Sequence, residues 1–109
     1  MSNELKGTIP TELGKLIHLE ELNLDNNQIS GTIPKELSNL KKLDTLMLTE
    51  NLIEGRIPKP MMSLEGLRFL GLRNNMLTGS IHTEIGQLSN LVNLRLDGNL
   101  LDVSTAGLY

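Results

Sequence analysis

The chain repeats itself every 24 residues, and this period constrains its fold more than any other feature. Three leucines keep the step, at Leu19, Leu43, Leu67 and Leu91, at Leu22, Leu46, Leu70 and Leu94, and at Leu24, Leu48, Leu72 and Leu96. One such coil cannot cover its own apolar face, and repeated coils bury it by stacking. We therefore expect a single solenoid over residues 1–109, with a partial coil at 1–18, coils at 19–42, 43–66 and 67–90, and a partial terminal coil at 91–109.

The leucine spacing within a coil predicts a short strand followed by a turn. Leu46 and Leu48 stand two residues apart, so both are expected to point inward. Identical strands stacked at about 4.8 Å build one parallel sheet. Leu37 and Leu40 follow Pro34 with a spacing of three, which suits a short helix or 3₁₀ turn. The predicted fold is a right-handed α/β solenoid with the parallel sheet on its concave face and helical or 3₁₀ turns on its convex face.

An asparagine marks the end of each predicted strand and keeps the same period. A buried amide at this place can bond backbone groups of its own coil and of the adjacent one. We expect a structural ladder formed by Asn3, Asn27, Asn51, Asn75 and Asn99.

The third coil departs from the repeat on its convex side. Pro60 replaces a glutamate that other coils carry, and proline disfavours helical geometry at the residue before it, Lys59. We expect this turn to be reshaped, with Met61 filling the core position and Met62 left nearer to solvent.

The whole pattern, L-x-x-L-x-L-x-x-N-x-L-x-G-x-I-P, resembles the plant-type leucine-rich repeat family. The stretches 7–10 and 31–34, both Gly-Thr-Ile-Pro, match that subtype rather than leucine-rich repeats at large. The resemblance implies an extra short strand near Gly-x-Ile-Pro, a twisted superhelix and a role in recognition. Within the family, the chain resembles the ectodomains of receptor-like kinases and receptor-like proteins.

Composition and motifs argue against catalysis. The chain has no cysteine and no phosphate-cradling or metal-binding motif, so we expect no metal, no cofactor and no enzyme activity. His18 and His82 lie at different phases of the repeat, too far apart to share a metal, and solvated surface is the default expectation for both. A formal charge of -3 disfavours nucleic acid as a partner, and no apolar run is long enough to span a bilayer.

The outward strand positions form the candidate binding surface. The early coils are acidic there and the later coils carry arginines, with Met47 and Phe69 between them. The candidate ligand-binding residues are Glu21, Asp25, Thr45, Met47, Phe69, Arg73, Asn93 and Arg95. Phe69 is either an interface anchor or a packing residue lying over Met47 and Thr45. The uneven charge either orients a partner or is simply the polar surface of any solvated strand face.

These observations favour a module that binds a protein or peptide through its concave strand face, as a fragment of a receptor-like or signalling protein. An inhibitor of a secreted hydrolase and a structural spacer of a larger protein are the alternatives. Neither end carries a polar cap, so the chain is expected to be a fragment or to self-associate end to end. The resemblance suggests an extracellular or plasma-membrane ectodomain, although the chain has no export signal, cysteine cap or glycosylation sequon.

Overall fold

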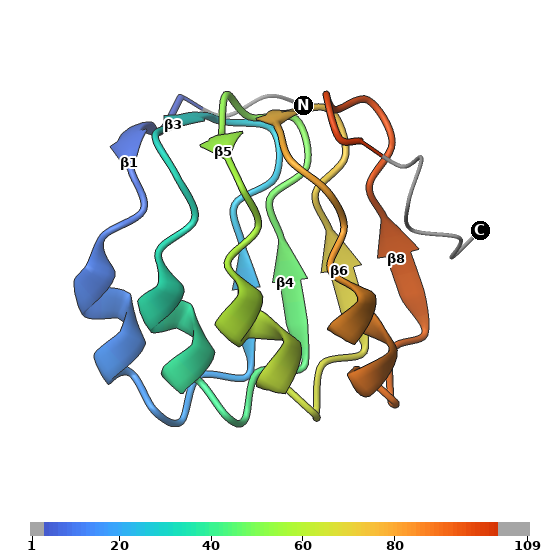
Figure 1. Cartoon of the computed structure of the whole chain (residues 1–109). Coiled ribbons are helices and arrows are strands. Elements are labelled where there is room, and N and C mark those ends of the chain that lie inside the picture. The colour runs from blue at the N-terminus through green and yellow to red at the C-terminus, as the bar shows by residue number, and fades with distance from the viewer. Residues whose placement is uncertain (1–3, 103–109) are drawn as a thin grey trace.

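Parallel strands at the same phase of successive coils form the concave sheet. The structure is a computed structural model that describes residues 4–102. Its main sheet has the order β2-β4-β6-β8, made of β2 (Glu21–Asn23), β4 (Thr45–Met47), β6 (Phe69–Gly71) and β8 (Asn93–Arg95). Each strand is paired in register with residues 24 positions away, so Leu22, Leu46, Leu70 and Leu94 form one row. The predicted solenoid with a concave parallel sheet is confirmed (Figure 1).

The convex side consists of four short 3₁₀ turns, one per coil, within residues 4–102. They lie side by side in front of the sheet in Figure 1 and span η1 (Thr11–Lys15), η2 (Lys35–Asn39), η3 (Lys59–Ser63) and η4 (Thr83–Gln87). The residue before each turn is extended, and it is proline in the first three coils and His82 in the fourth. Among the described residues, no helix is long and apolar enough to cross a membrane.

Short strands along the upper edge of Figure 1 pair between neighbouring coils with a different register. The pairs are β1 (Lys6–Thr8) with β3 (Gln28–Ser30), and β5 (Glu54–Gly55) with β7 (Met76–Leu77). Paired residues here are 22 positions apart, as in Gly7 with Ile29, rather than 24. The pairing of successive coils is therefore shifted by two residues at this edge relative to the concave sheet. These short strands are the extra strands that the resemblance implied.

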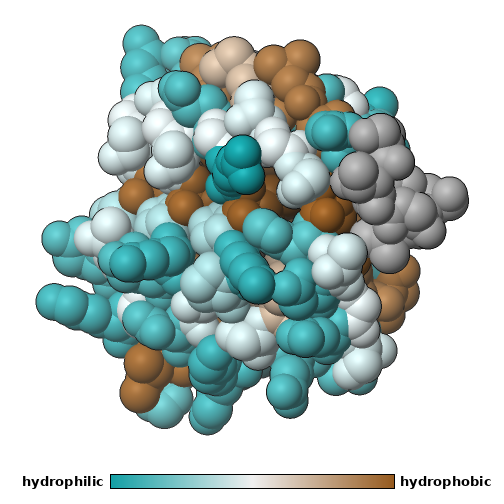
Figure 2. Space-filling view, in the orientation of Figure 1, coloured by the Kyte–Doolittle hydropathy of each residue, from teal (hydrophilic) through white to brown (hydrophobic). Residues whose placement is uncertain are grey.

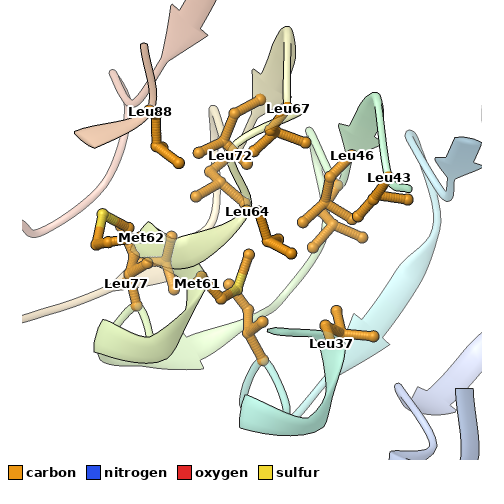
Figure 3. Packing of buried hydrophobic residues seen from close by; sticks show 14 of the residues in the cluster. Leu37, Leu43, Leu46, Met61, Met62, Leu64, Leu67, Leu72, Leu77 and Leu88 are labelled. Atoms are coloured by element: carbon orange, nitrogen blue, oxygen red, sulfur yellow. The ribbon is translucent and has the colours of Figure 1, made fainter. Parts of the chain in front are cut away.

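The core fills the space between the sheet and the 3₁₀ turns (Figure 3). Leu46 and Leu48 of the sheet, Leu37 of a turn and Leu64 after the next turn are completely buried. Equivalent leucines in the outermost described coils, such as Leu22 and Leu94, are only partly buried. Each coil thus depends on its neighbours to cover its apolar residues.

The asparagines join neighbouring coils through their side-chain amides. The Nδ2 of Asn51 donates to the carbonyl of Leu24 in the preceding coil at 2.9 Å and to that of Leu48 in its own coil at 3.1 Å. Its Oδ1 accepts a hydrogen bond from the Ile29 N–H at 3.1 Å. Asn75 and Asn99 repeat this arrangement one and two coils further on, and Asn27 bonds its own coil and Leu5. Asn3 lies outside the described residues.

The predicted reshaping of the third turn is wrong. The turn Lys59–Ser63 has the same length and phase as the others, with Pro60 in its first turn. The N–H groups of a first helical turn have no partner within the helix, so proline removes no hydrogen bond there.

The expected exposure of Met62 is wrong as well. Met61 and Met62 are both buried, at 1% and 4% exposure, and both lie within the cluster drawn in Figure 3. Met62 also borders a hollow between η3 and η4, together with Glu84 and Gln87. A long unbranched thioether fills such an irregular gap, which removes its apolar surface from water.

His82 also differs from the expectation of a solvated surface residue, whereas His18 is exposed. His82 is half-buried, and its Nε2 lies 2.8 Å from the carbonyl oxygen of Ile57 in the preceding coil. The ring nitrogen donates this bond, because a carbonyl can only accept. His82 thereby links two coils where the other coils have proline.

Candidate functional site: a hollow on the concave face

The outward side of the concave sheet contains a hollow of about 410 Å³. Residues from the second to the fifth coil line it: Asp25, Thr45, Met47, Thr49, Phe69, Leu70, Gly71, Arg73, Asn93 and Arg95. The structure brings seven of the eight candidate residues together at this place. The eighth, Glu21, is exposed on β2 beside Thr45 but does not line the hollow.

The hollow forms because one row of the sheet lacks a side chain at its centre. Met47, Gly71 and Arg95 are neighbours in register on β4, β6 and β8. A Cβ added to Gly71 would lie 2.6 Å from the Cε of Met47 and 3.0 Å from the Oγ1 of Thr49. The Met47 side chain therefore lies across Gly71, and together they form an apolar floor.

Phe69 is half-buried beside this floor and contacts a cation. It is paired in register with Thr45 and Asn93 on the neighbouring strands. The guanidinium carbon of Arg68 lies 5.2 Å from the centroid of the Phe69 ring, which is a cation–π distance. The ring is thus held from one side while its surface contributes to the hollow.

The arginines of the later coils are tied to aspartates. Arg68 forms an ion pair with Asp44 of the preceding coil. Asp97 pairs with both Arg73, at 2.9 Å, and Arg95, at 3.3 Å. Hydrogen bonds from Arg68 and from Arg95 lower the pKa values of Asp44 and Asp97, respectively. The predicted basic half is therefore partly neutralised within the sheet.

Asp25 is in the opposite electrostatic situation at the acidic edge of the hollow. It is half-buried, and its Oδ1 accepts a hydrogen bond from the Thr49 N–H at 2.7 Å. Burial raises the pKa of Asp25, and the nearby Glu50 adds to the rise, while the Thr49 hydrogen bond opposes it. Its negative charge is consequently poorly solvated.

Three lining residues of the hollow are not among the candidate residues: Thr49 and Gly71, whose phase places them on the outward face, and Leu70. The leucine phase of Leu70 predicts an inward side chain, which its 2% exposure confirms, although the residue also borders the hollow. Gly71 carried a usable signal, because a glycine at an outward strand position leaves a gap between larger neighbours.

An apolar column on another surface was also missed. Leu52, Met76 and Leu100 recur at the 24-residue step and are 47%, 43% and 69% exposed. Figure 2 shows apolar atoms along the upper edge of the molecule, where the short strands lie in Figure 1. These three residues do not line the hollow of the concave face or the hollow between η3 and η4.

The hollow presents both apolar and polar groups to a ligand. Within residues 4–102, no group of three or more His, Cys, Asp or Glu side chains is placed to hold a metal ion. The hollow instead combines an apolar floor with carboxylates, guanidinium groups and amides at its edge. Such a combination of apolar contact area and a few polar groups is typical of ligand sites.

The stacked coils, the inward asparagines and the open concave sheet define a leucine-rich-repeat solenoid. The family model described as leucine rich repeat matches residues 17–77, and the chain belongs to this family. No curated protein sequence matches the chain.

The chain is similar in structure to plant receptor ectodomains. The plant peptide hormone receptor RGFR1 in complex with RGF2 is 35% identical, with a TM-score of 0.90, over 92% of this chain and 16% of that chain. The ectodomain of the receptor kinase SOBIR1 from Arabidopsis thaliana is 36% identical, with a TM-score of 0.87, over 94% of this chain and 57% of that chain. A plant ice-binding protein is 34% identical, with a TM-score of 0.81, over 93% of this chain and 34% of that chain. The chain thus spans less than two thirds of the length of each of these proteins.

Proposed function

We propose that this chain is a binding module, not an enzyme, and that it holds a protein or peptide segment against the hollow of its concave face. The observation that carries the proposal is the difference along one row of the sheet, where Met47, Gly71 and Arg95 replace one another while the leucine rows beside them stay constant. Stacking requires the leucines but places no demand on the outward row, so that row is free to serve a ligand.

The relatives support this proposal at the level of class. RGFR1 was solved in complex with RGF2, and SOBIR1 is a receptor kinase. We extend this to the present chain as a segment of a receptor-like or signalling protein. Its own partner is then a protein or peptide rather than a nucleic acid.

The similarity to an ice-binding protein shows that the same fold serves another function. Binding to ice requires a flat, regular array of small groups, whereas the concave columns mix carboxylates, arginines, an aromatic ring and a gap at Gly71. This irregularity favours recognition of a shaped ligand.

The test is selection of peptides from a randomised phage-displayed library on the full chain, followed by affinity measurement with synthetic copies. Phe69→Ala, Met47→Ala and Arg73→Glu should each weaken binding, with about a tenfold or larger loss for Phe69→Ala because buried aromatic anchors dominate such interfaces. Circular dichroism should show an unchanged fold. The matched controls Met76→Ala and Arg56→Glu change the same residue types away from the hollow and should have no effect.

Unchanged affinity in all three concave variants would contradict the proposal and favour a structural spacer. The alternative of a hydrolase inhibitor is separated by enzyme assay, since inhibition of a secreted polysaccharide hydrolase by the chain would support that function.

A further inference from the structure

The apolar floor of the hollow and the flexible Met47 side chain suit one large apolar side chain of a ligand. Phe69, Leu70 and Gly71 of β6 all line the hollow, and Gly71 contributes no side chain of its own. Met47 lies across Gly71, and its unbranched thioether can move to follow the shape of an incoming group. The floor is therefore apolar, shallow at rest and adjustable.

Charged side chains around the hollow are less completely paired on the acidic side than on the basic side. The arginines of the later coils already pair with aspartates of the same sheet. On the concave side of the second and third coils, by contrast, four carboxylates form no ion pair with any other residue between 4 and 102: Glu20, Glu21, Asp25 and Glu50. A partner with positive charge on this side is favoured, because complementary charge steers and orients association.

Asp25 is the carboxylate best placed to meet such a charge. It lines the hollow itself, and one of its oxygens is already bonded to the Thr49 N–H. Burial disfavours its charged form and raises its pKa. A cationic group of a ligand would supply the interaction that water cannot give at this half-buried position.

The distance between coils sets the distance between the two ligand residues that would contact Asp25 and the hollow over Gly71. Asp25 follows β2, and Gly71 ends β6 two coils further along the stack. Strands about 4.8 Å apart place these two coils roughly 10 Å apart, and an extended chain advances about 3.3 Å per residue. About three residues of an extended ligand therefore separate the two contacts.

We infer that the concave face binds an extended basic segment, in which a large apolar side chain enters the hollow over Gly71 and a Lys or Arg about three residues away lies against Asp25. This inference rests on the proposed function, since it names the chemistry of the ligand at the same site. An acidic segment lying over Arg73 and Arg95 is the opposing arrangement, and it would have to compete with Asp97 for both guanidinium groups.

The test reads the composition of peptides selected from the randomised library on the full chain, and then measures synthetic peptides by fluorescence anisotropy. Selected peptides should carry Lys or Arg about three residues from Phe, Leu or Met. Replacing the basic residue of a peptide by Glu should weaken its binding by about tenfold or more, since a like charge then meets Asp25. Binding should also weaken as salt rises.

Protein variants assign this preference to the acidic side. Asp25→Asn keeps an oxygen that can accept the Thr49 N–H, and Glu21→Lys changes an exposed residue, so both preserve the fold. Both should reduce the preference for basic over acidic peptides several-fold. Glu54→Lys makes the same charge change as Glu21→Lys, but on the exposed edge strand β5, and should leave the preference unchanged.

The outcomes separate this inference from the proposed function. Selected peptides that are acidic or charge-neutral, yet lose affinity in Phe69→Ala, would overturn the inference and leave the concave binding site standing. A basic preference that Glu54→Lys reduces as effectively as Glu21→Lys, which makes the same change of charge, would also overturn it, because the effect would then come from net charge. Binding insensitive to Phe69→Ala would overturn both.

Discussion

The interior of the stack and the concave surface are built from the same strands, yet they follow opposite rules. In β4, Leu46 is completely buried, and its row in the sheet is leucine in every coil from Leu22 to Leu94. One residue further on, Met47 is half-exposed, and its neighbours in register are Asn23, Gly71 and Arg95. Inward positions are constrained by the coils above and below, whereas outward positions are free to differ. Departures from the repeat on the outward side therefore mark the surface that we propose to bind a ligand.

The largest expected effect is the difference in stability between the Leu46→Ala and Met47→Ala variants. Truncating the buried Leu46 should lower the free energy of unfolding by about 2–5 kcal/mol, because lost burial and a new cavity add. Met47→Ala should cost about 1 kcal/mol or less, since the side chain is half in water. Urea denaturation monitored by circular dichroism measures both. Equal losses would mean that the outward row is also part of the structural core.

Next in size is Asn51→Ala, compared with Asn93→Ala. Asn51 is 6% exposed and holds two carbonyls and one N–H of neighbouring segments, so its loss should cost about 1–3 kcal/mol. The exposed Asn93 on the outward side should cost a few tenths of a kcal/mol or less, as surface substitutions usually do. Similar unfolding midpoints for the two variants would contradict a structural role for the inward amide.

A gain in stability is expected from Glu50→Asn. Glu50 has a left-handed backbone with φ of 59°, a position filled by Asn26, Asn74 and Gly98 in the other coils. Asparagine and glycine adopt this conformation more readily, so the substitution should stabilise the fold by roughly 1 kcal/mol. Glu54→Asn, at an exposed strand position, serves as the control for loss of charge. A decrease in thermal stability for Glu50→Asn would show that the glutamate makes a compensating contribution.

The smallest effect is a pH dependence at Asp25. Because burial raises its pKa in the folded state above the ordinary value of 3.8, the folded chain holds this proton more tightly than the unfolded chain. Protonated Asp25 thus contributes to the free energy of unfolding below pH 3.8, and this contribution is lost as the pH rises through the folded-state pKa. Asp25→Asn should accordingly be slightly more stable than the wild type at neutral pH, with the difference shrinking on acidification. A difference that instead grows on acidification, in melts across this range, would contradict the sign.

Much of the fold and part of the site could be predicted from the sequence because both depend on the repeat phase. The position of a residue within the 24-residue repeat predicts that Leu46 points inward and Phe69 outward. It also predicts that Asp25, Thr49 and Arg73, which are 24 residues apart, lie next to one another on neighbouring coils. It could not show that Arg73 and Arg95 share Asp97, since long side chains reach across columns in ways that phase does not encode. It also misjudged Pro60 and Met62, because the cost of a proline depends on whether its missing N–H was needed, and burial of a methionine depends on the gap beside it.

The sequence by itself determined the stack, its parallel sheet and the direction of each strand residue, since a 24-residue period with alternating leucines allows no other way to bury them. Only the tertiary structure decided that Met47 covers Gly71, that the later arginines are internally paired and that Asp25 is half-buried beside an apolar hollow. These features arise between coils, from side-chain length and local burial, which no single repeat contains.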